Sequence, residues 1–449
     1  MELELPFDVD VTQDGHLSLG GCDALELAER FGTPLYVIDE QAVRERCRRY
    51  RKAVESLPGG GLAVYAAKAF WVGGMAEIVA EEGLGADVSS EAEMRLALAA
   101  GILPQRLVLH GNNKSPSEIE LAVRVGVGRV VADSLWELER LGEAAAQGGR
   151  RLGVLLRIQP GVKAGFHDAM QTGHEAAKFG IPIEDGQARQ AVALVLRHPY
   201  LELRGYHVHI GSQILDLEPY RQAARVVATF AVQMARELGA PCREIDMGGG
   251  LGARYVAGDH PPSIETLVET VGRVVADVFA AAGLPVPALL VEPGRSIVAE
   301  AGTTLYRVGA IKRLATGQLV VAVDGGMSDN PRVALYRARY TAVLARDPRG
   351  RPEGRPVRIV GRLCESGDVL IEDALLPPLA SGDVLAILTT GAYHHTMASN
   401  YNGLPRPAVV GVSQGRARVW VRRERWEEMM ATDEALARLV RTGPRTAGA

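Results

Sequence analysis

The chain has 449 residues, of which 47% are hydrophobic and 23% charged, proportions typical of a globular protein long enough for two domains. Its formal net charge of -4 provides no basic field for a nucleic-acid backbone, and no stretch approaches the ~20 apolar residues that span a bilayer. The four cysteines are dispersed without a CxxC pattern, and the acidic N-terminal sequence lacks the order of a signal peptide. We therefore expect a cytoplasmic protein with neither nucleic-acid nor membrane partners.

Between residues 60 and 295, short apolar strands alternate with glycine-rich or polar loops and with helical segments. We expect eight strands, each with the loop that follows it: 62–68, 85–90, 106–113, 129–134, 153–161, 205–213, 244–250 and 288–295. Amphipathic helices are expected between them, including 89–101, 115–126, 134–149 and 218–240. Several of these begin at a serine and end at a glycine. This alternation predicts an α/β fold, a parallel TIM-type (β/α)8 barrel over residues 41–296.

After residue 300 the pattern changes to strand-like segments separated by Gly, Pro and Asp turns. These segments are 303–314, 318–326, 339–346, 356–363, 384–393 and 407–423, followed by a helical pattern at 425–440. We predict a β-rich C-terminal domain over residues 297–449. The N-terminal segment, residues 1–40, is expected to pack with this domain and to add strands to it.

Lys68 stands at the end of the first expected barrel strand, and lysine is scarce, because only six of the 50 basic residues are lysines. A solvated or ion-paired lysine is the ordinary interpretation of such a residue. In a TIM-type barrel, however, the active site lies at the carboxyl ends of the strands. The polar residues expected at those ends are Lys68, Asp87, Ser89, His110, Asn112, Asp133, Arg157, His207, His209, Ser212, Asp246, Glu292 and Arg295.

Two loops in this set indicate a phosphate site. The sequence DMGGG follows the seventh expected strand and EPGR follows the eighth, the place where such barrels commonly bind phosphate. Consecutive glycines let backbone N–H groups converge on an anion. A phosphate cradle, a strand-end lysine and a carboxylate, Glu292, together suggest pyridoxal phosphate, which needs a lysine for its aldehyde and a group for its pyridine nitrogen. We therefore interpret Lys68 as the Schiff-base lysine.

At this point the chain resembles a known family, the fold-type III pyridoxal phosphate-dependent decarboxylases, with an alanine racemase-like barrel. Among them it is most similar to the branch that converts meso-2,6-diaminopimelate to L-lysine and carbon dioxide, the last step of lysine biosynthesis. The resemblance runs nearly end to end. It is carried by YAAKA, GADVSS, HGNNKS, TGHEAAKFGI, HVHIGSQ, DMGGGLG, EPGRSIV, DGGMSDNPRVALYRARY, CESGD and GAYHHTMASNYN.

The resemblance implies a role for each matched residue. Lys68 binds the cofactor's aldehyde, His209 stacks on the ring and Glu292 faces the pyridine nitrogen. The phosphate is surrounded by Ser212, Gly248, Gly249, Gly250, Gly294 and Arg295, with Tyr393 reaching it from the partner subunit. The substrate's distal ammonium and carboxylate are held by Arg295, Arg332, Tyr336, Glu365 and Tyr393. Cys364 sits over the cofactor as proton donor, and its CESGD segment enters the active site of the other subunit of a homodimer. No metal is implied.

The expected substrate follows from charge. Two arginines suit a distal carboxylate, and a diamine precursor without that carboxylate leaves them unpaired. A related decarboxylase acting on ornithine, arginine or carboxynorspermidine remains an alternative, as does a regulatory homologue without activity. Many relatives read roughly EAHTHEYI where this chain has KAGFHDAM at 163–170, and many carry an arginine where it has Gly403 and Leu404. Either departure bears on substrate range or loop closure.

Overall fold

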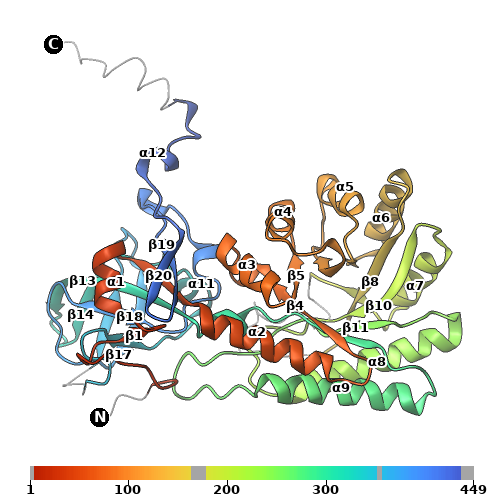
Figure 1. Cartoon of the computed structure of the whole chain (residues 1–449), viewed down its shortest axis with the longest axis horizontal. Coiled ribbons are helices and arrows are strands. Elements are labelled where there is room, and N and C mark those ends of the chain that lie inside the picture. The colour runs from red at the N-terminus through yellow and green to blue at the C-terminus, as the bar shows by residue number, and fades with distance from the viewer. Residues whose placement is uncertain (1–4, 163–177, 351–355, 436–449) are drawn as a thin grey trace. The chain divides into compact units, whose positions relative to one another are not determined.

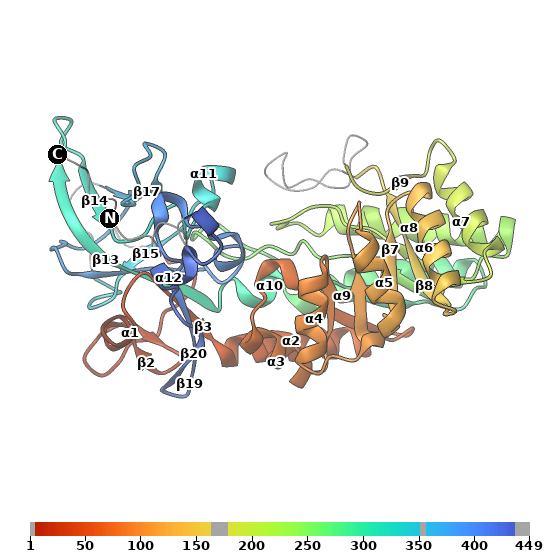
Figure 2. The ribbon, with the colours of Figure 1, turned by 90° about the horizontal axis from the view of Figure 1, so that it is seen from above.

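The computed structural model describes residues 5–162, 178–350 and 356–435. The chain divides into two compact units, shown as ribbons in Figures 1 and 2. The barrel unit comprises Glu40–Ala301 with Gly391–Tyr393, and the β unit comprises Met1–Asp39, Gly302–Thr390 and His394–Ala449. No helix within the described ranges has both the length and the hydropathy needed to cross a membrane.

The barrel unit contains a closed parallel sheet of eight strands, which confirms the predicted fold class. The strands in chain order are β4 (Gly61–Ala66), β5 (Gly85–Val88), β6 (Leu107–Leu109), β7 (Arg129–Ala132), β8 (Leu152–Gln159), β10 (Leu201–His207), β11 (Glu244–Asp246) and β12 (Ala288–Val291). Pairing of β12 with β4 and of β8 with β10 closes the circle. The two-residue strand β9 (Ile181–Pro182) extends the edge of β8.

The interior of the barrel is apolar. Val64, Val108, Val131, Leu155 and Leu290, from five different strands, form one buried cluster. Branched side chains of this kind fill barrel cores in layers, so the barrel is solid rather than a pore. The strands therefore act as a rigid base for the residues that follow their carboxyl ends.

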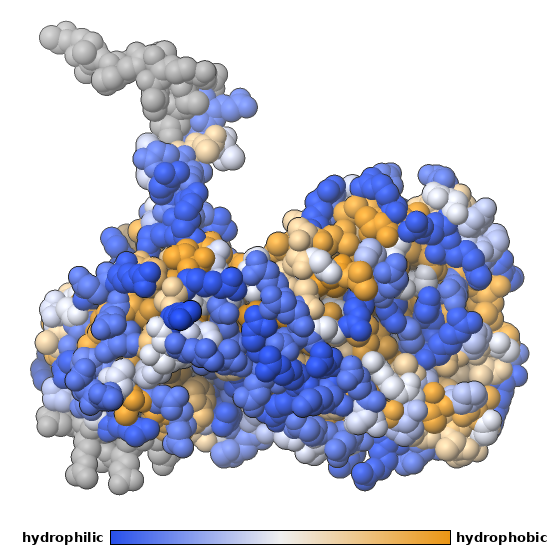
Figure 3. Space-filling model, viewed as in Figure 1, coloured by the Kyte–Doolittle hydropathy of each residue, from blue (hydrophilic) through white to orange (hydrophobic). Residues whose placement is uncertain are grey.

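Helices surround the barrel on the outside, and Figure 2 shows α4, α5 and α6 following one another around it. Their bounds are α2 (Glu40–Glu55), α3 (Gly73–Glu81), α4 (Glu91–Ala99), α5 (Pro116–Val125), α6 (Leu135–Gln147), α7 (Gln187–Arg197), α8 (Glu218–Leu238), α9 (Ile264–Ala281) and α10 (Arg295–Val298). Arginine-rich α2 buries Val43, Cys47 and Tyr50, and its exposed face is hydrophilic (Figure 3). This amphipathic pattern fits a helix that covers a barrel.

The serine signals in the sequence mark the starts of three helices. Ser90, Ser115 and Ser134 each accept a hydrogen bond from the backbone N–H three residues later, as an N-cap does. Ser115 and Glu118 form a complete capping box at the start of α5. These caps fix where each loop ends, and the loops carry the residues that follow the strands.

The β unit is built on a sheet in the order β17-β16-β14-β13-β3-β19-β20, in which β18 also pairs with β13 and with β15. These strands are β3 (Leu35–Asp39), β13 (Gly302–Arg313), β14 (Leu319–Val323), β15 (Ala342–Leu344), β16 (Val357–Val360), β17 (Val369–Ala374), β18 (Val384–Ile387), β19 (Ala408–Ser413) and β20 (Arg416–Val421). β3 lies between β13 and β19, so the N-terminal segment does join this sheet, as expected.

The shorter elements of the β unit are β1 (Ser18–Leu19), β2 (Cys22–Asp23), α1 (Ala24–Phe31), α11 (Arg332–Tyr336) and α12 (Trp426–Met429). The helical pattern expected at 425–440 is thus wrong in its extent, because α12 ends in a turn after one helical turn. Residues beyond 435 lie outside the described part of the chain.

Candidate active site

A cavity of about 460 Å³ lies among the loops at the carboxyl ends of the barrel strands. Three residues to which the sequence gave a role, Lys68, His209 and Glu292, line it together. The other lining residues are Ser89, His110, Gly111, Asn112, Asn113, Lys114, Glu118, Arg157, Phe179 and His207. The expectation that polar strand-end residues converge therefore holds for residues from most of the barrel strands.

Lys68 lies in a single 3-10 turn, Ala67–Ala69, directly after β4. Its Nζ donates to Oδ2 of Asp87 at 2.6 Å, and Asp87, at the end of neighbouring β5, is only 1% exposed. Burial opposes the charged amine, but the negative charges of Asp87, Tyr393 and Glu292 outweigh it and raise the pKa of Lys68. The amine is therefore held as an ammonium beside a fixed carboxylate.

Glu292 follows β12 and is bound by two imidazoles. Its Oε1 accepts from Nε2 of His110 at 2.5 Å and its Oε2 from Nε2 of His207 at 3.3 Å. Burial works against the carboxylate, but these two histidines outweigh it and hold the pKa of Glu292 well below its usual range. The neighbouring Asp246 has a pKa well above its usual range because it is fully buried and lies near the charge of Glu292. Glu292 is thus the ionised member of this pair of acids.

His110, His207 and Glu292 also have the composition of a metal site, since their ligand atoms lie within 4.8 Å of one another. Two ligands of one tetrahedral zinc ion stand about 3.3 Å apart, given metal–ligand distances near 2.0–2.1 Å. The 2.5 Å between His110 and Glu292 is instead the length of a hydrogen bond. The geometry therefore favours a hydrogen-bonded cluster over a metal centre.

His209 follows β10 and presents an uncharged ring. Its Nδ1 accepts a hydrogen bond from the backbone N–H of Gly249 at 3.2 Å, so this nitrogen carries no proton. Burial, reinforced by the positive charges of Arg157 and Lys68, keeps the pKa of His209 well below its ordinary value. A neutral imidazole in the cavity suits stacking against a planar ring better than pairing with an anion.

The glycine loop after β11 has room for nothing larger than glycine. A Cβ on Gly249 would lie 2.3 Å from the carbonyl oxygen of Glu292, and one on Gly250 would lie 2.5 Å from that of Gly211. Gly248 and Gly250 also have positive φ angles of 63° and 106°. On Gly294, a Cβ would lie 2.8 Å from that of Ala69. The backbone is thus brought close to the site with no side chains in between, as an anion cradle requires.

Arg295 lies beside this loop at the start of α10 and is 6% exposed. Its Nη2 donates to Oγ of Ser212 at 3.0 Å, and its Nη1 donates to the hydroxyl of Tyr255. The guanidinium also lies 4.9 Å from the ring centroid of Tyr393, whose backbone N–H donates to the carbonyl of Ala69. Tyr393 therefore lies against Arg295 of its own chain, which differs from the expectation that it reaches the site from a partner subunit.

Comparison with known proteins assigns the chain to a family. The family model described as "Pyridoxal-dependent decarboxylase, pyridoxal binding domain" matches residues 40–299. Diaminopimelate decarboxylase of Bacillus subtilis (strain 168) is 42% identical over 421 residues, which are 94% of this chain and 96% of that protein. The chain belongs to the diaminopimelate decarboxylase family.

Two further members support this membership. Diaminopimelate decarboxylase of Actinosynnema pretiosum subsp. auranticum is 46% identical over 419 residues, covering 93% of this chain and 92% of that protein. The crystal structure of diaminopimelate decarboxylase from M. jannaschii in co-complex with L-lysine has 34% identity and a TM-score of 0.89. It covers 96% of this chain and 98% of that structure, so both units of the decarboxylase fold are present here.

Four residues that the family resemblance singles out belong to the β unit. Arg332 begins α11, is 3% exposed, and donates from Nη1 to the hydroxyl of Tyr340 at 2.5 Å. Tyr336 ends the same helix. Cys364 and Glu365 lie exposed on a loop between β16 and β17, where the backbone N–H of Cys364 donates to Oδ1 of Asn402 at 2.7 Å. The structure describes these four residues within their own unit.

The loop that carries Cys364 is braced by Asp368, which is 3% exposed. One carboxylate oxygen of Asp368 accepts from the backbone of Leu363 at 2.8 Å, and the other accepts from that of Met327 at 2.6 Å. Asp368 thus ties the CESGD segment to the DGGMSDNPR segment, and through it to α11. Both segments carry residues that the decarboxylase resemblance implicates in substrate binding.

Both departures from the family pattern have a definite place in the chain. Residues 163–170 fall outside the described residues. Gly403 ends a 3-10 turn, Tyr401–Gly403, with a φ of 69°, and its N–H donates to the carbonyl of Asn400. Glycine adopts such a positive φ without strain, so the residue fits a tight turn after SNYN.

Sequence reasoning missed several residues that complete this decarboxylase site. Tyr255, the hydroxyl partner of Arg295, follows the glycine loop by five residues, and that proximity was its only signal. Asp87, His110 and His207 stood in the strand-end set, but no role was assigned to them. Their roles depend on which strands become neighbours, and one sequence does not reveal which carboxylate a given imidazole meets.

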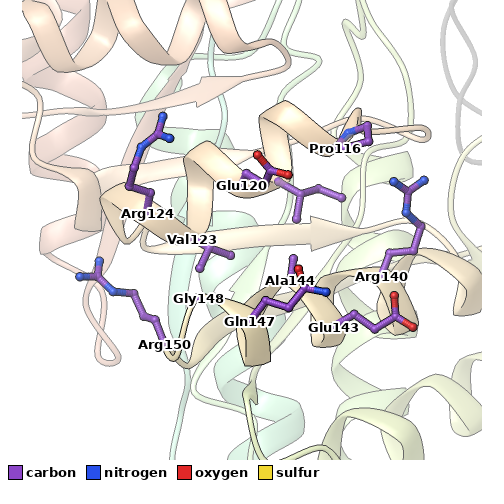
Figure 4. Close-up of a pocket in the computed structure, with 11 residues that line it drawn as sticks. Pro116, Glu120, Val123, Arg124, Arg140, Glu143, Ala144, Gln147, Gly148 and Arg150 are labelled. Carbon is purple, nitrogen blue, oxygen red and sulfur yellow. The ribbon is translucent and has the colours of Figure 1, made fainter.

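A second hollow, of about 580 Å³, lies outside the barrel between α5 and α6 (Figure 4). Its charged lining includes Arg124 and Arg140 but also Glu120 and Glu143, and none of the predicted site residues line it. The mixed charge selects neither an anion nor a cation. The chemistry of this family member therefore belongs to the smaller cavity at the strand ends.

Proposed function

We propose that this protein decarboxylates meso-2,6-diaminopimelate to L-lysine and carbon dioxide with pyridoxal 5'-phosphate as its cofactor. The observation that carries the proposal is the convergence of Lys68, Glu292 and His209 in one barrel cavity beside the glycine loop and Arg295. The names of its relatives support the substrate, as does the L-lysine bound in the M. jannaschii structure.

The residues present fit this cofactor. Lys68 offers an amine for the aldehyde, and ionised Glu292 offers a negative charge for a protonated pyridine nitrogen. The neutral ring of His209 is suited to stacking. For the phosphate there is a cradle that a Cβ would fill, made by Gly248, Gly249, Gly250 and Gly294, with Ser212, Arg295 and Tyr393 beside it. When bound, the cofactor supplies an electron sink for the pair left on Cα when the carboxylate departs.

The protein's own groups govern the protons. Glu292 stays ionised because two imidazoles bind it, so it stabilises positive charge at the position it faces. His209 has no charge to contribute, so it holds the ring by contact alone. Cys364, whose thiol lies on an exposed loop of the single chain, donates the proton that Cα receives after carbon dioxide leaves.

The substrate's far end is recognised by charge and hydrogen bonding. Arg295 and Arg332 bind the distal carboxylate, for which a guanidinium fork is well suited. Glu365 binds the distal ammonium, and the hydroxyls of Tyr336 and Tyr393 complete the pocket. In a homodimer, the exposed loop with Cys364 and Glu365 enters the active site of the second subunit. A diamine precursor lacking the distal carboxylate leaves buried arginines unpaired and is rejected.

We also place the enzyme in the cytoplasm. All four cysteines are free, and free thiols persist in a reducing compartment. This fits a biosynthetic enzyme with a reactive thiol, Cys364, on its surface.

The assignment of Lys68 can be tested directly. Reduction of the cofactor-loaded protein with sodium borohydride locks pyridoxal phosphate onto the amine that holds it, and peptide mass mapping identifies that amine. We expect the added mass on Lys68 and none on Lys114, which lines the same cavity. Label on another lysine, or no label, would contradict the proposed cofactor site.

A further inference from the structure

The carboxylate of Glu292 is held by two imidazoles, one on each oxygen. His110 binds Oε1 and His207 binds Oε2, and all three side chains are buried, with exposures of 7%, 0% and 4% for His110, His207 and Glu292. The two imidazole rings meet edge to face, with centroids 4.9 Å apart. Since a carboxylate oxygen accepts more than one hydrogen bond, each oxygen keeps capacity for a further donor.

His110 is the nearer of the two partners, and its position is fixed by its neighbours. It is the first residue after β6, and its backbone N–H donates to the carbonyl of Val88 at 2.8 Å. The next residue, Gly111, has its carbonyl bound by Nζ of Lys114 at 2.7 Å. The backbone is therefore tied down on both sides of the imidazole.

Lys114 is an unusual anchor because the whole side chain is buried. It is 3% exposed, and its Nζ also donates to the carbonyl of Val131 at 2.7 Å and to Oε1 of Glu137 at 2.9 Å. All three ammonium protons are thus used, which satisfies a buried charge. The other oxygen of Glu137 accepts from the backbone of Asp133 at 2.8 Å. This network joins the loops after β6 and β7 and holds His110 on Glu292.

We infer that His110 is a positioning residue for the cofactor, because the hydrogen bond from its Nε2 fixes the carboxylate of Glu292 against the cofactor's ring nitrogen. The inference rests on the proposed function, which places Glu292 at that nitrogen. It assigns to the HGNNK segment a purpose beyond packing: His110 holds Glu292, and Lys114 holds His110. A carboxylate without His110 rotates more freely and loses its closest donor.

The test uses protein reconstituted with pyridoxal phosphate labelled with nitrogen-15 in the ring, whose chemical shift reports protonation of that nitrogen. His110→Leu removes the hydrogen bond, whereas His110→Gln keeps an N–H donor. His260→Leu, on an exposed loop of the barrel unit, is the matched control. Cofactor affinity is measured in parallel, and circular dichroism confirms that each variant is folded.

We expect His110→Leu to move the ring-nitrogen signal towards that of the unprotonated ring and to weaken cofactor binding about tenfold, the effect of losing one hydrogen bond to a charged group. His110→Gln should recover most of both properties, and His260→Leu should change neither. Glu292→Gln separates the two claims. If it shifts the signal while His110→Leu does not, the inference about His110 is overturned and the proposed function stands. If Glu292→Gln leaves the signal unchanged, the placement of Glu292 at the ring nitrogen fails.

Discussion

Nζ of Lys68 lies 2.6 Å from Oδ2 of Asp87, where the neighbouring strands β4 and β5 end. The lysine side chain is 46% exposed, whereas the aspartate is almost completely buried, so the carboxylate is the fixed partner and the amine the accessible one. This arrangement presents a charged amine at the mouth of the cavity. Its reactivity towards an aldehyde therefore depends on the carboxylate beside it.

Asp87→Asn should make the amine of Lys68 more reactive at neutral pH. The charge of Asp87 helps to raise the pKa of Lys68, so its removal lets burial lower that pKa and leaves more neutral amine at a given pH. The rate at which the cofactor-free protein reacts with pyridoxal phosphate, measured against pH, should rise severalfold at pH 7 and its profile should move to lower pH. Asp277→Asn, on the exposed face of α9, is the control. An unchanged profile for Asp87→Asn would refute this role.

Gly249→Ala should weaken cofactor binding without unfolding the barrel. The added Cβ would lie 2.3 Å from the carbonyl oxygen of Glu292, which forces the backbone to move at a cost of about 1–3 kcal/mol. Equilibrium dialysis against pyridoxal phosphate should show a loss of roughly tenfold or more in affinity. Gly258→Ala is matched to it, because a Cβ there meets nothing within 4 Å. Equal affinities for the two variants would exclude the glycine loop as the phosphate cradle.

Glu244→Gln should destabilise the barrel while leaving its chemistry intact. Arg129 and Glu244 begin β7 and β11, strands that are not neighbours, and they pair through two hydrogen bonds of 2.7 Å. The pair is mostly buried, so an unpaired arginine should cost about 3 kcal/mol in urea unfolding. The exposed pair of Arg49 and Glu265 is the comparison, and Glu265→Gln should cost less than about 1 kcal/mol. Similar losses for both would show that burial does not set the strength of these pairs.

Mixing two inactive variants tests the shared active site of the proposed homodimer. Lys68→Ala and Cys364→Ala should each lose turnover alone. In randomly mixed dimers, half are hybrids, and each hybrid has one site with both residues intact if they come from different subunits. Carbon dioxide release should then recover to about a quarter of the wild-type rate. No recovery would show that both residues act within one chain.

The sequence predicted the parts of this protein that depend on local pattern. All eight barrel strands lie within the expected segments, and Ser90, Ser115 and Ser134 cap helices because capping involves neighbours a few residues apart. The tail helix was overextended, since helical periodicity does not reveal a turn after Met429. The contact of His110 with Glu292 spans 182 residues, and it exists only because the barrel closes. Such contacts follow from tertiary structure and leave no mark on the local sequence.

The most direct test of the account is carbon dioxide release by the pyridoxal phosphate-loaded protein from meso-diaminopimelate, ornithine, lysine, arginine and carboxynorspermidine in parallel. The account predicts release from meso-diaminopimelate alone, with L-lysine as the product, because only that substrate satisfies the amine site at Lys68 together with the paired arginines and Glu365. Release from ornithine, arginine, lysine or carboxynorspermidine instead would contradict the assigned pocket, and no release from any of the five would contradict the proposed decarboxylase activity itself.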